Sequence, residues 1–178
     1  LILIGLFIFG IFVYLKVFTA NTTNTTKQYV LIPSDANFGT VKDSLAKYVK
    51  NMDNFIYAAE AKGYNKAITP GRFLITPNMD NYSLITSLGR NVPVRVSFNN
   101  QETLQKLAER LAKQTEPTAQ DYLTAFTDPD FLEEYGFTAD NVLSAFMPNT
   151  YEFYWNVSAI IVRDKLIREY LQFWNVER

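Results

Sequence analysis

The stretch AFMPNTYEFYWN, residues 145–156, decides how the second half of this chain folds. A Pro-Asn-Thr turn runs directly into aromatic residues, and alternate side chains of an extended segment face opposite ways. One face would carry Tyr151, Phe153 and Trp155, and the other Glu152, Tyr154 and Asn156. The pattern favours a strand with the first face buried and the second solvated. A second interpretation is that the start of this segment lines a site for a ring-shaped ligand.

The composition restricts the chemistry that the chain can perform. Its 178 residues suffice for one medium or two small domains, and the formal charge of −1 argues against a nucleic-acid partner. Cysteine and histidine are both absent, which excludes disulfides, thiolate nucleophiles and the usual zinc and iron sites. We therefore expect no metal site and no cofactor. Acid–base chemistry has to come from Asp, Glu, Lys or Tyr.

Residues 1–18 predict a transmembrane helix. They read LILIGLFIFGIFVYLKVF, in which only Lys16 is charged, and about 20 apolar residues span a bilayer as a helix. A signal peptide would have a shorter apolar region and a small-residue cleavage site, and Ala20 after Val17-Phe18-Thr19 matches this poorly. We therefore predict an uncleaved anchor. Because the chain does not start with Met, we expect it to begin inside this segment.

Residues 19–27, TANTTNTTK, predict a polar tether without apolar periodicity. Asn21-Thr22-Thr23 and Asn24-Thr25-Thr26 also match the N-glycosylation pattern. Because so short a pattern recurs by chance, we interpret the segment as a flexible linker.

Residues 28–90 predict a small βααβ unit. The sequence indicates a strand at 28–32, a helix that starts at Thr40, a second helix that Gly63 ends, and a strand from Arg72 to Thr76 after a type II turn at Pro70-Gly71. A short helix over Tyr82–Leu88 follows. This order is that of a LysM module, a fold that commonly binds N-acetylglucosamine polymers. Many small α+β units share the order, so a structural role is an equal alternative.

Residues 91–178 predict a strand at 92–98 followed mainly by helices. Asn99 or Asn100 would cap the first helix, a Thr118–Asp121 capping box would open the next, and residues 128–137 would form a third. We interpret Glu133-Glu134 in that third helix as a solvated pair. The last helix would start near Ser158 and bury a wide stripe of Ile160, Ile161, Leu166, Ile167, Tyr170, Leu171 and Trp174. We expect the chain to end inside a domain, and the fold class to be α+β.

Three segments together resemble a known family. They are ITPGRFLITPNMDNYSLITSLGRN, VPVRVSFNNQETLQKLAERLAKQ and FMPNTYEFYWNVSA, behind an apolar anchor. The combination is similar to the YceG-like endolytic murein transglycosylases (MltG), in the forms found in Bacteroidetes-type bacteria. The resemblance covers essentially the whole chain, with residues 91–178 as the truncated beginning of the catalytic domain.

The resemblance implies a lytic transglycosylase in the cell inner membrane, with its soluble part on the periplasmic side. Such an enzyme cleaves glycan strands between N-acetylmuramic acid and N-acetylglucosamine and leaves 1,6-anhydro ends. One glutamate can act as acid and then as base. The expected partners are peptidoglycan glycan strands, the membrane and cell-wall synthesis proteins.

The resemblance also assigns site residues. It implies that Pro148, Asn149, Thr150 and Tyr151 bind the glycan. Asn149 stands where the family has Asp, which leaves a hydrogen-bonding role but no role as a base. The catalytic glutamate is expected beyond residue 178, because the sequence around Glu169 and Glu177 does not match the family's catalytic helix. The alternative function is a membrane-tethered murein-binding or scaffold module without catalysis.

Overall fold

The computed structural model describes residues 2–175, and the chain divides into two compact units. Unit 1 is Leu1–Val92 and unit 2 is Pro93–Arg178. Both units combine helices with a two-stranded sheet, so the predicted α+β class is confirmed.

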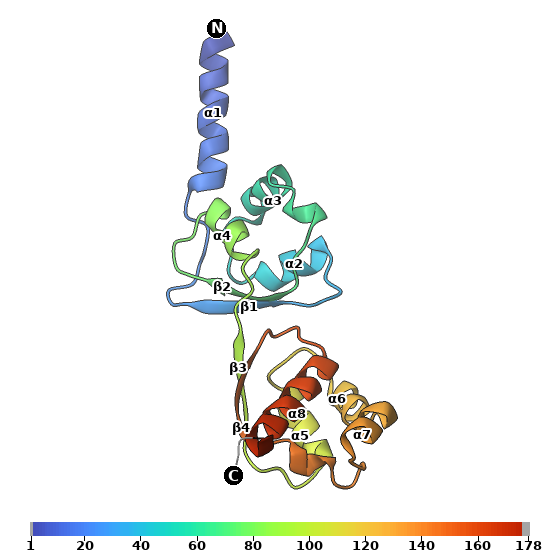
Figure 1. Cartoon of the computed structure of the whole chain (residues 1–178). Helices are drawn as coiled ribbons and strands as arrows, with labels where there is room; N and C mark the ends of the chain where they lie inside the picture. The colour runs from blue at the N-terminus through green and yellow to red at the C-terminus, as the bar shows by residue number, and fades with distance from the viewer. Residues whose placement is uncertain (1, 176–178) are drawn as a thin grey trace. The chain divides into compact units, whose positions relative to one another are not determined.

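Unit 1 contains the predicted strand-helix-helix-strand order (Figure 1). Its elements are α1 (Ile2–Phe18), β1 (Gln28–Ile32), α2 (Phe38–Leu45), α3 (Met52–Ala61), η1 (Tyr64–Lys66), β2 (Gly71–Ile75) and α4 (Asn81–Ser87). β1 pairs antiparallel with β2, with Val30 opposite Phe73. Val30 and Ile32 are buried while Tyr29 and Leu31 are exposed, because alternate strand residues face opposite sides. The buried side meets apolar residues of α2, α3 and α4, and together they form the core of unit 1.

Local capping explains where the helices of unit 1 begin and end. α2 begins at Phe38 after Asn37, whose side chain accepts a hydrogen bond from the Thr40 N–H, so the predicted start at Thr40 is two residues too late. Gly63 has a φ of 72°, which confirms it as the residue that ends α3.

Gly71, at the start of β2, has a φ of 140° instead of the roughly 80° of the predicted type II turn. A Cβ at Gly71 would lie 2.4 Å from the Asn91 amide nitrogen, so only glycine fits there.

The prediction of a flexible tether at 19–27 is wrong for its first half. Asn21 and Thr22 are buried, and their backbone N–H groups donate to the Met79 carbonyl at 2.7 and 3.2 Å. The Asn21 side chain donates to the Asn51 carbonyl and to Asn81 Oδ1, both at 2.8 Å. Polar residues without apolar periodicity are here ordered by hydrogen bonds, which the composition does not reveal.

The apolar helix α1 does not bury any residue, and all its large apolar side chains from Ile2 to Ile11 are at least 45% exposed. Across residues 2–175, none of the helices has the length and hydropathy that a membrane crossing requires.

Unit 2 consists of one two-stranded antiparallel sheet covered by helices. Its elements are β3 (Val94–Phe98), α5 (Leu104–Ala112), α6 (Ala119–Phe126), α7 (Pro129–Tyr135), η2 (Val142–Ala145), β4 (Asn149–Phe153) and α8 (Ala159–Asn175). β3 and β4 pair antiparallel, with Val96 opposite Tyr151 and Arg95 opposite Glu152. Tyr151 and Phe153 are buried, whereas Glu152 and Tyr154 are exposed. The strand interpretation of the opening stretch is therefore confirmed as far as Phe153, whereas Trp155 and Asn156 lie beyond β4 in a turn and are both half-buried.

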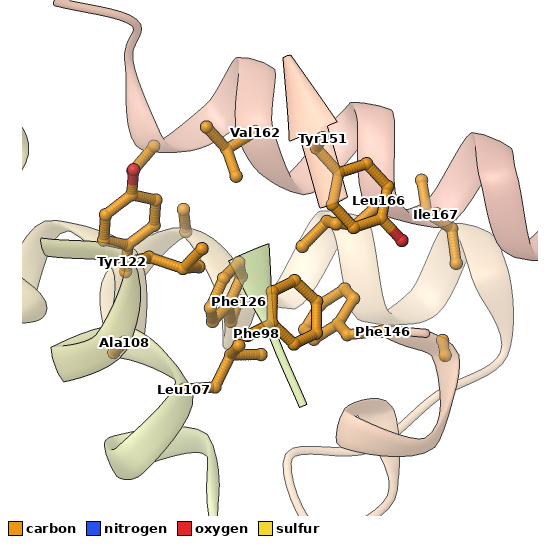
Figure 2. Packing of buried hydrophobic residues seen from close by; sticks show 14 of the residues in the cluster. Phe98, Leu107, Ala108, Tyr122, Phe126, Phe146, Tyr151, Val162, Leu166 and Ile167 are labelled. Carbon is orange, nitrogen blue, oxygen red and sulfur yellow. The ribbon is translucent and has the colours of Figure 1, made fainter. Parts of the chain in front are cut away.

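Aromatic rings dominate the core of unit 2 (Figure 2). Phe98 stacks on Tyr151 at 5.7 Å between ring centroids, and Phe126 contacts Phe146 at 4.6 Å. Tyr122 is fully buried, and its hydroxyl lies 2.6 Å from the Thr115 hydroxyl. Burial raises the pKa of Tyr122 to about 12, because the charged phenolate is poorly solvated there.

Capping again sets the helix ends in unit 2, with one error in the prediction. Thr118 and Asp121 form the predicted capping box, and hydrogen bonds from Thr118 lower the pKa of Asp121. Asp128, Pro129 and Gly136 begin and end α7 as predicted. However, Thr103 and not Asn99 or Asn100 caps α5, because its hydroxyl accepts from the Lys106 N–H.

Helix α8 buries a narrower stripe than predicted. Val162, Leu166 and Ile167 are buried, whereas Ile160 and Ile161 are each 54% exposed and Leu171 and Trp174 are also exposed. The predicted stripe is therefore wrong in four of its residues. It included too much of the helix circumference, since the sheet and helices of unit 2 cover one side only.

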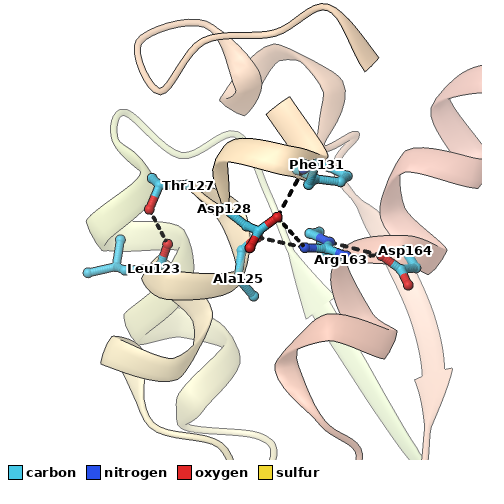
Figure 3. Close-up of polar contacts among 7 residues, drawn as sticks. All are labelled: Leu123, Ala125, Thr127, Asp128, Phe131, Arg163 and Asp164. Carbon is cyan, nitrogen blue, oxygen red and sulfur yellow. Dashed lines mark hydrogen bonds and ion pairs between the residues drawn. The ribbon is translucent and has the colours of Figure 1, made fainter. Parts of the chain in front are cut away.

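Arg163 connects α8 to α6 and α7 (Figure 3). Its guanidinium donates to Asp164 at 2.8 Å and to the Ala125 carbonyl at 3.2 Å, and lies 3.8 Å from Asp128. It also stacks over the Phe131 ring at 4.3 Å. The side chain is only 13% exposed, so these partners replace the water that a buried cation would otherwise need.

Candidate functional site

A groove of about 440 Å³ opens in unit 2 beside the end of β3. We call it the Phe98 groove. Its lining divides evenly between apolar residues (Phe98, Leu107, Leu143, Phe146, Pro148) and polar residues (Asn100, Gln101, Asp140, Asn141, Ser144).

Two chain segments bring the polar residues together. Asn100 and Gln101 follow β3 directly, and Asp140, Asn141 and Ser144 surround the start of η2. The Asn141 side chain accepts from the Thr138 N–H at 2.8 Å, which leaves its Nδ2 group as the donor. The Gln101 amide donates to Asn99 Oδ1 at 2.6 Å, so its orientation is fixed. The groove thus presents oriented amide groups at its polar side.

A second hollow of about 540 Å³ continues from the same strand end. It shares Phe98 and Gln101 with the Phe98 groove and adds Ser97, Asn99 and Arg110. Arg110 donates to the Ser97 carbonyl at 3.2 Å, and Gln114 bonds both backbone groups of Ser97. These side chains satisfy the outer edge of β3, which keeps the strand end rigid next to both hollows.

The four residues predicted to bind substrate separate in the structure. Pro148 lines the Phe98 groove, and Asn149 and Thr150 are exposed directly beyond it at the start of β4. The Asn149 side chain accepts from the Thr150 N–H at 2.7 Å. Tyr151 is only 4% exposed, and its hydroxyl donates to the Met147 carbonyl at 2.7 Å. The Tyr151 side chain therefore belongs to the core and does not form an accessible wall.

Burial in that core, together with the smaller effect of the negative charge of Glu169, raises the pKa of Tyr151 to about 12. Tyr151 is therefore neutral at physiological pH, which suits a buried hydrogen-bond donor and excludes a phenolate base. Its role is to hold Phe98, on which it stacks, at the floor of the groove.

The described carboxylates do not form a catalytic arrangement at the groove. Asp140 is the carboxylate among its lining residues and is exposed, without the burial that a general acid relies on. Glu152 pairs with Arg95 at 3.5 Å on the solvated sheet face, and Glu133 and Glu134 are exposed on α7. Glu169 is half-buried on α8, and Glu177 lies outside the described residues. Within residues 2–175, no cluster of three carboxylates could hold a metal ion.

Sequence reasoning missed most of the groove. It treated Asn99 and Asn100 as helix caps and did not single out Gln101, Asp140 or Asn141. A usable signal was present, because two polar runs, NNQ at 99–101 and DN at 140–141, each sit in a loop next to a strand or to the Pro-Asn-Thr turn. Loops held by a rigid scaffold are where binding residues concentrate.

Comparison with known proteins identifies the family. A family model described as the YceG-like family matches residues 30–178. The chain belongs to the YceG-like family. The predicted resemblance is thereby confirmed, and the match includes the Phe98 groove, the β3–β4 pair and all but the first two residues of the β1–β2 pair of this YceG-like chain.

One solved structure that resembles this YceG-like chain is that of a yceG-like protein from Listeria monocytogenes. The two are 20% identical with a TM-score of 0.44, and the alignment covers 84% of this chain and 56% of that protein. The chain thus spans little more than half the length of that relative. No curated protein sequence matches it.

Proposed function

We propose that this YceG-like chain is the glycan-holding part of a membrane-held murein lytic transglycosylase, and that the Phe98 groove contacts the glycan strand. Membership in a family associated with murein transglycosylase-type activity supports the reaction class. The observation that carries the proposal for the site is the groove lining, which combines five apolar residues with three amide side chains, Asn100, Gln101 and Asn141.

That lining suits a saccharide for a physical reason. A pyranose ring has apolar C–H faces and a rim of hydroxyls that both donate and accept hydrogen bonds. Pro148, which is exposed, and Leu143, which is half-buried, offer apolar surface to a ring face, and Asn100 and Asn141 offer amides at the rim. N-Acetyl groups add a further amide, which pairs with the same side chains. A neutral saccharide can therefore bind in such a groove without contact to a charged side chain.

The chemistry would divide between this chain and a glutamate expected after residue 178. Cleavage of a glycosidic bond needs a carboxylic acid that protonates the leaving oxygen. The role that we propose for Asn100, Asn141 and Asn149 is to hold the strand in register with that acid. Positioning of this kind lowers the activation barrier because the bound strand has already lost its translational and rotational freedom before the reaction begins.

We also propose that α1, although its 17 residues fall short of the roughly 20 of a full span, inserts into the cell inner membrane and keeps the units on its periplasmic side. The exposed apolar surface of α1 supports this, since isolated chains in water rarely leave so large a patch uncovered.

The complete protein tests the function directly. It is incubated with purified murein, and the products are searched by mass spectrometry for 1,6-anhydromuramyl ends. We expect such ends from the parent and markedly fewer from Asn100→Ala and Asn149→Ala, with unfolding midpoints unchanged because both side chains are exposed. Asn175→Ala, an exposed asparagine of α8 outside the groove, is the matched control and keeps full activity. Equal cleavage by all four proteins would remove the groove from the mechanism.

The second candidate is a murein-binding module without catalysis. It is favoured by one observation, the solvent exposure of Asp140, the carboxylate in the groove lining. Murein that sediments with the complete protein but never acquires anhydro ends would support this candidate over the enzyme.

A further inference from the structure

Lysines and aromatic rings surround the base of α1, at the end where the apolar helix meets the rest of unit 1. Lys16 Nζ lies 4.5 Å from the Phe12 ring centroid and 5.0 Å from that of Tyr57 on α3. Phe18 stacks on Tyr82 of α4 at 5.7 Å, and Lys62 Nζ lies 3.7 Å from the Tyr82 ring. We call Lys16, Phe18, Tyr57, Lys62 and Tyr82 the collar.

The collar is held in a fixed position relative to α1. The Asn81 side chain donates to the Lys16 carbonyl at 2.7 Å and accepts from Asn21 at 2.8 Å. Val17 packs against the core of unit 1. Because these bonds are buried or half-buried, the helix leaves the unit without a flexible joint.

We infer that the collar docks on the phospholipid headgroup layer, so that unit 1 contacts the membrane surface instead of being separated from it by water. This rests on the proposed insertion of α1 into lipid. Aromatic rings with a polar tip concentrate at the headgroup level, and lysines there place their stems in lipid and their ammonium groups in water. Phe18 and Tyr82 are 46% and 47% exposed, so their rings are open to such contact.

The surroundings favour the headgroup layer over a single anionic ligand. Asp53 and Glu60 lie four residues before and three residues after Tyr57 on α3, on nearly the same face of the helix. The collar is therefore not a purely cationic patch, and its aromatic surface carries the interaction. The sheet of β1 and β2 lies at the opposite end of unit 1 from α1 (Figure 1). Its exposed Leu31 is the natural reference point for a surface that stays in water.

These 178 residues contain no cysteine, so single spin labels can test the inference once any cysteine elsewhere in the complete protein is replaced by serine. Phe7→Cys reports α1, Ala61→Cys reports the collar one helical turn after Tyr57, and Leu31→Cys reports the far sheet. The complete protein is labelled at one of these sites and reconstituted in vesicles of equal parts phosphatidylethanolamine and phosphatidylglycerol. Collision rates with dissolved oxygen and with a water-soluble nickel chelate are then measured by electron paramagnetic resonance.

We expect a lipid signature at position 7, and a severalfold lower nickel collision rate at position 61 than at position 31. Tyr82→Ser added to Ala61→Cys raises the rate at position 61, whereas Tyr29→Ser, an exposed tyrosine outside the collar, leaves it unchanged.

Each other outcome overturns a defined statement. A lipid signature at position 7 with equal nickel rates at 61 and 31 contradicts docking and leaves the insertion of α1 intact. An aqueous signature at position 7 contradicts the insertion itself, and docking with it. Protection at position 61 that disappears when the protein is diluted in lipid means that a second copy of the chain covers the collar, which also overturns docking.

Discussion

Unit 1 and unit 2 close their folds by different means. In unit 1, hydrogen bonds of buried amide side chains hold the segment that follows α1 against the other elements of the unit. Asn21 bonds the backbone of Asn51 and the side chain of Asn81. In unit 2, ring stacking performs this task, with Phe98 on Tyr151 and Phe126 on Phe146. The contrast teaches that two α+β units of similar size can depend on directional polar bonds or on aromatic burial.

The difference fits the roles that we propose. A unit fixed to a helix in lipid benefits from hydrogen bonds that set one orientation, since such bonds are directional. A unit that holds a glycan needs a stiff floor under its groove, and interlocked rings are hard to deform. Substitutions can test whether the two units differ in this way.

The largest effect is expected from Phe126→Ala. Phe126 is fully buried between Tyr122 and Phe146, and removing such a ring costs about 3–5 kcal/mol through lost burial and a cavity. Both tryptophans, Trp155 and Trp174, lie in unit 2, so tryptophan fluorescence during urea unfolding reports this unit alone. Phe126→Leu is the control and should cost less. A loss below about 1 kcal/mol for Phe126→Ala would contradict aromatic closure of unit 2.

A smaller effect is expected from Asn21→Ala in unit 1. The change leaves the Asn51 N–H and Asn81 Oδ1 without their partner, at about 1–3 kcal/mol for buried polar groups. Hydrogen–deuterium exchange should accelerate in peptides that contain residues 20–24 and 79–81. Asn65→Ala is the matched control, because the Asn65 Oδ1 atom is buried without a hydrogen bond. Unchanged exchange in Asn21→Ala would mean that the amide network does not close unit 1.

High pH should destabilise unit 2 more than unit 1. The difference between their losses of unfolding free energy should grow by at most about 1.4 kcal/mol per pH unit. The pKa values of Tyr122 and Tyr151 in unit 2 and of Tyr64 in unit 1 are raised to about 12 by burial. The unfolded chain loses these protons near pH 10 and the folded chain near pH 12, so stability is complete below pH 10 and declines as the pH rises to 12. With two such tyrosines against one, unit 2 should lose stability more steeply. Urea midpoints from pH 9 to 12, read by fluorescence and by exchange, provide the test.

The smallest effects are expected from two matched tyrosine substitutions. Tyr122→Phe removes a hydroxyl that bonds Thr115 and should cost about 1 kcal/mol. Tyr64→Phe removes a buried hydroxyl that has no hydrogen bond, so it should be neutral or slightly stabilising. Thermal unfolding followed by exchange in each unit compares them. Equal destabilisation by the two substitutions would contradict the claim that the hydrogen bond between Tyr122 and Thr115 stabilises unit 2.

Local sequence signals predicted most elements of the fold. Alternation located β1 and β4, and the Thr118–Asp121 pair and Gly136 set helix ends. The errors arose where a choice between neighbouring polar residues depends on tertiary structure, as with Thr103 against Asn99 and Asn100. That Asn21 is held in a fixed position was also unpredictable, since its side-chain partners Asn51 and Asn81 lie 30 and 60 residues away.

The sequence predicted only one side of the candidate site. Pro148 and Asn149 lie at or beside the groove, but Tyr151 faces the core because strand alternation turns it inward. Asn100 and Asn141 both line the groove although they come from segments far apart in the sequence, which no local pattern encodes. The family resemblance located the region, and the structure supplied the second segment of the groove.

The most direct test of the account is to titrate the isotopically labelled protein with an N-acetylglucosamine–N-acetylmuramic acid oligosaccharide and to follow backbone amides by NMR. Contact with the Phe98 groove predicts saturable shifts in residues 98–101 and 140–144. Shifts confined to unit 1, or no saturable shift in either of these segments, would contradict the claim that this groove holds the glycan.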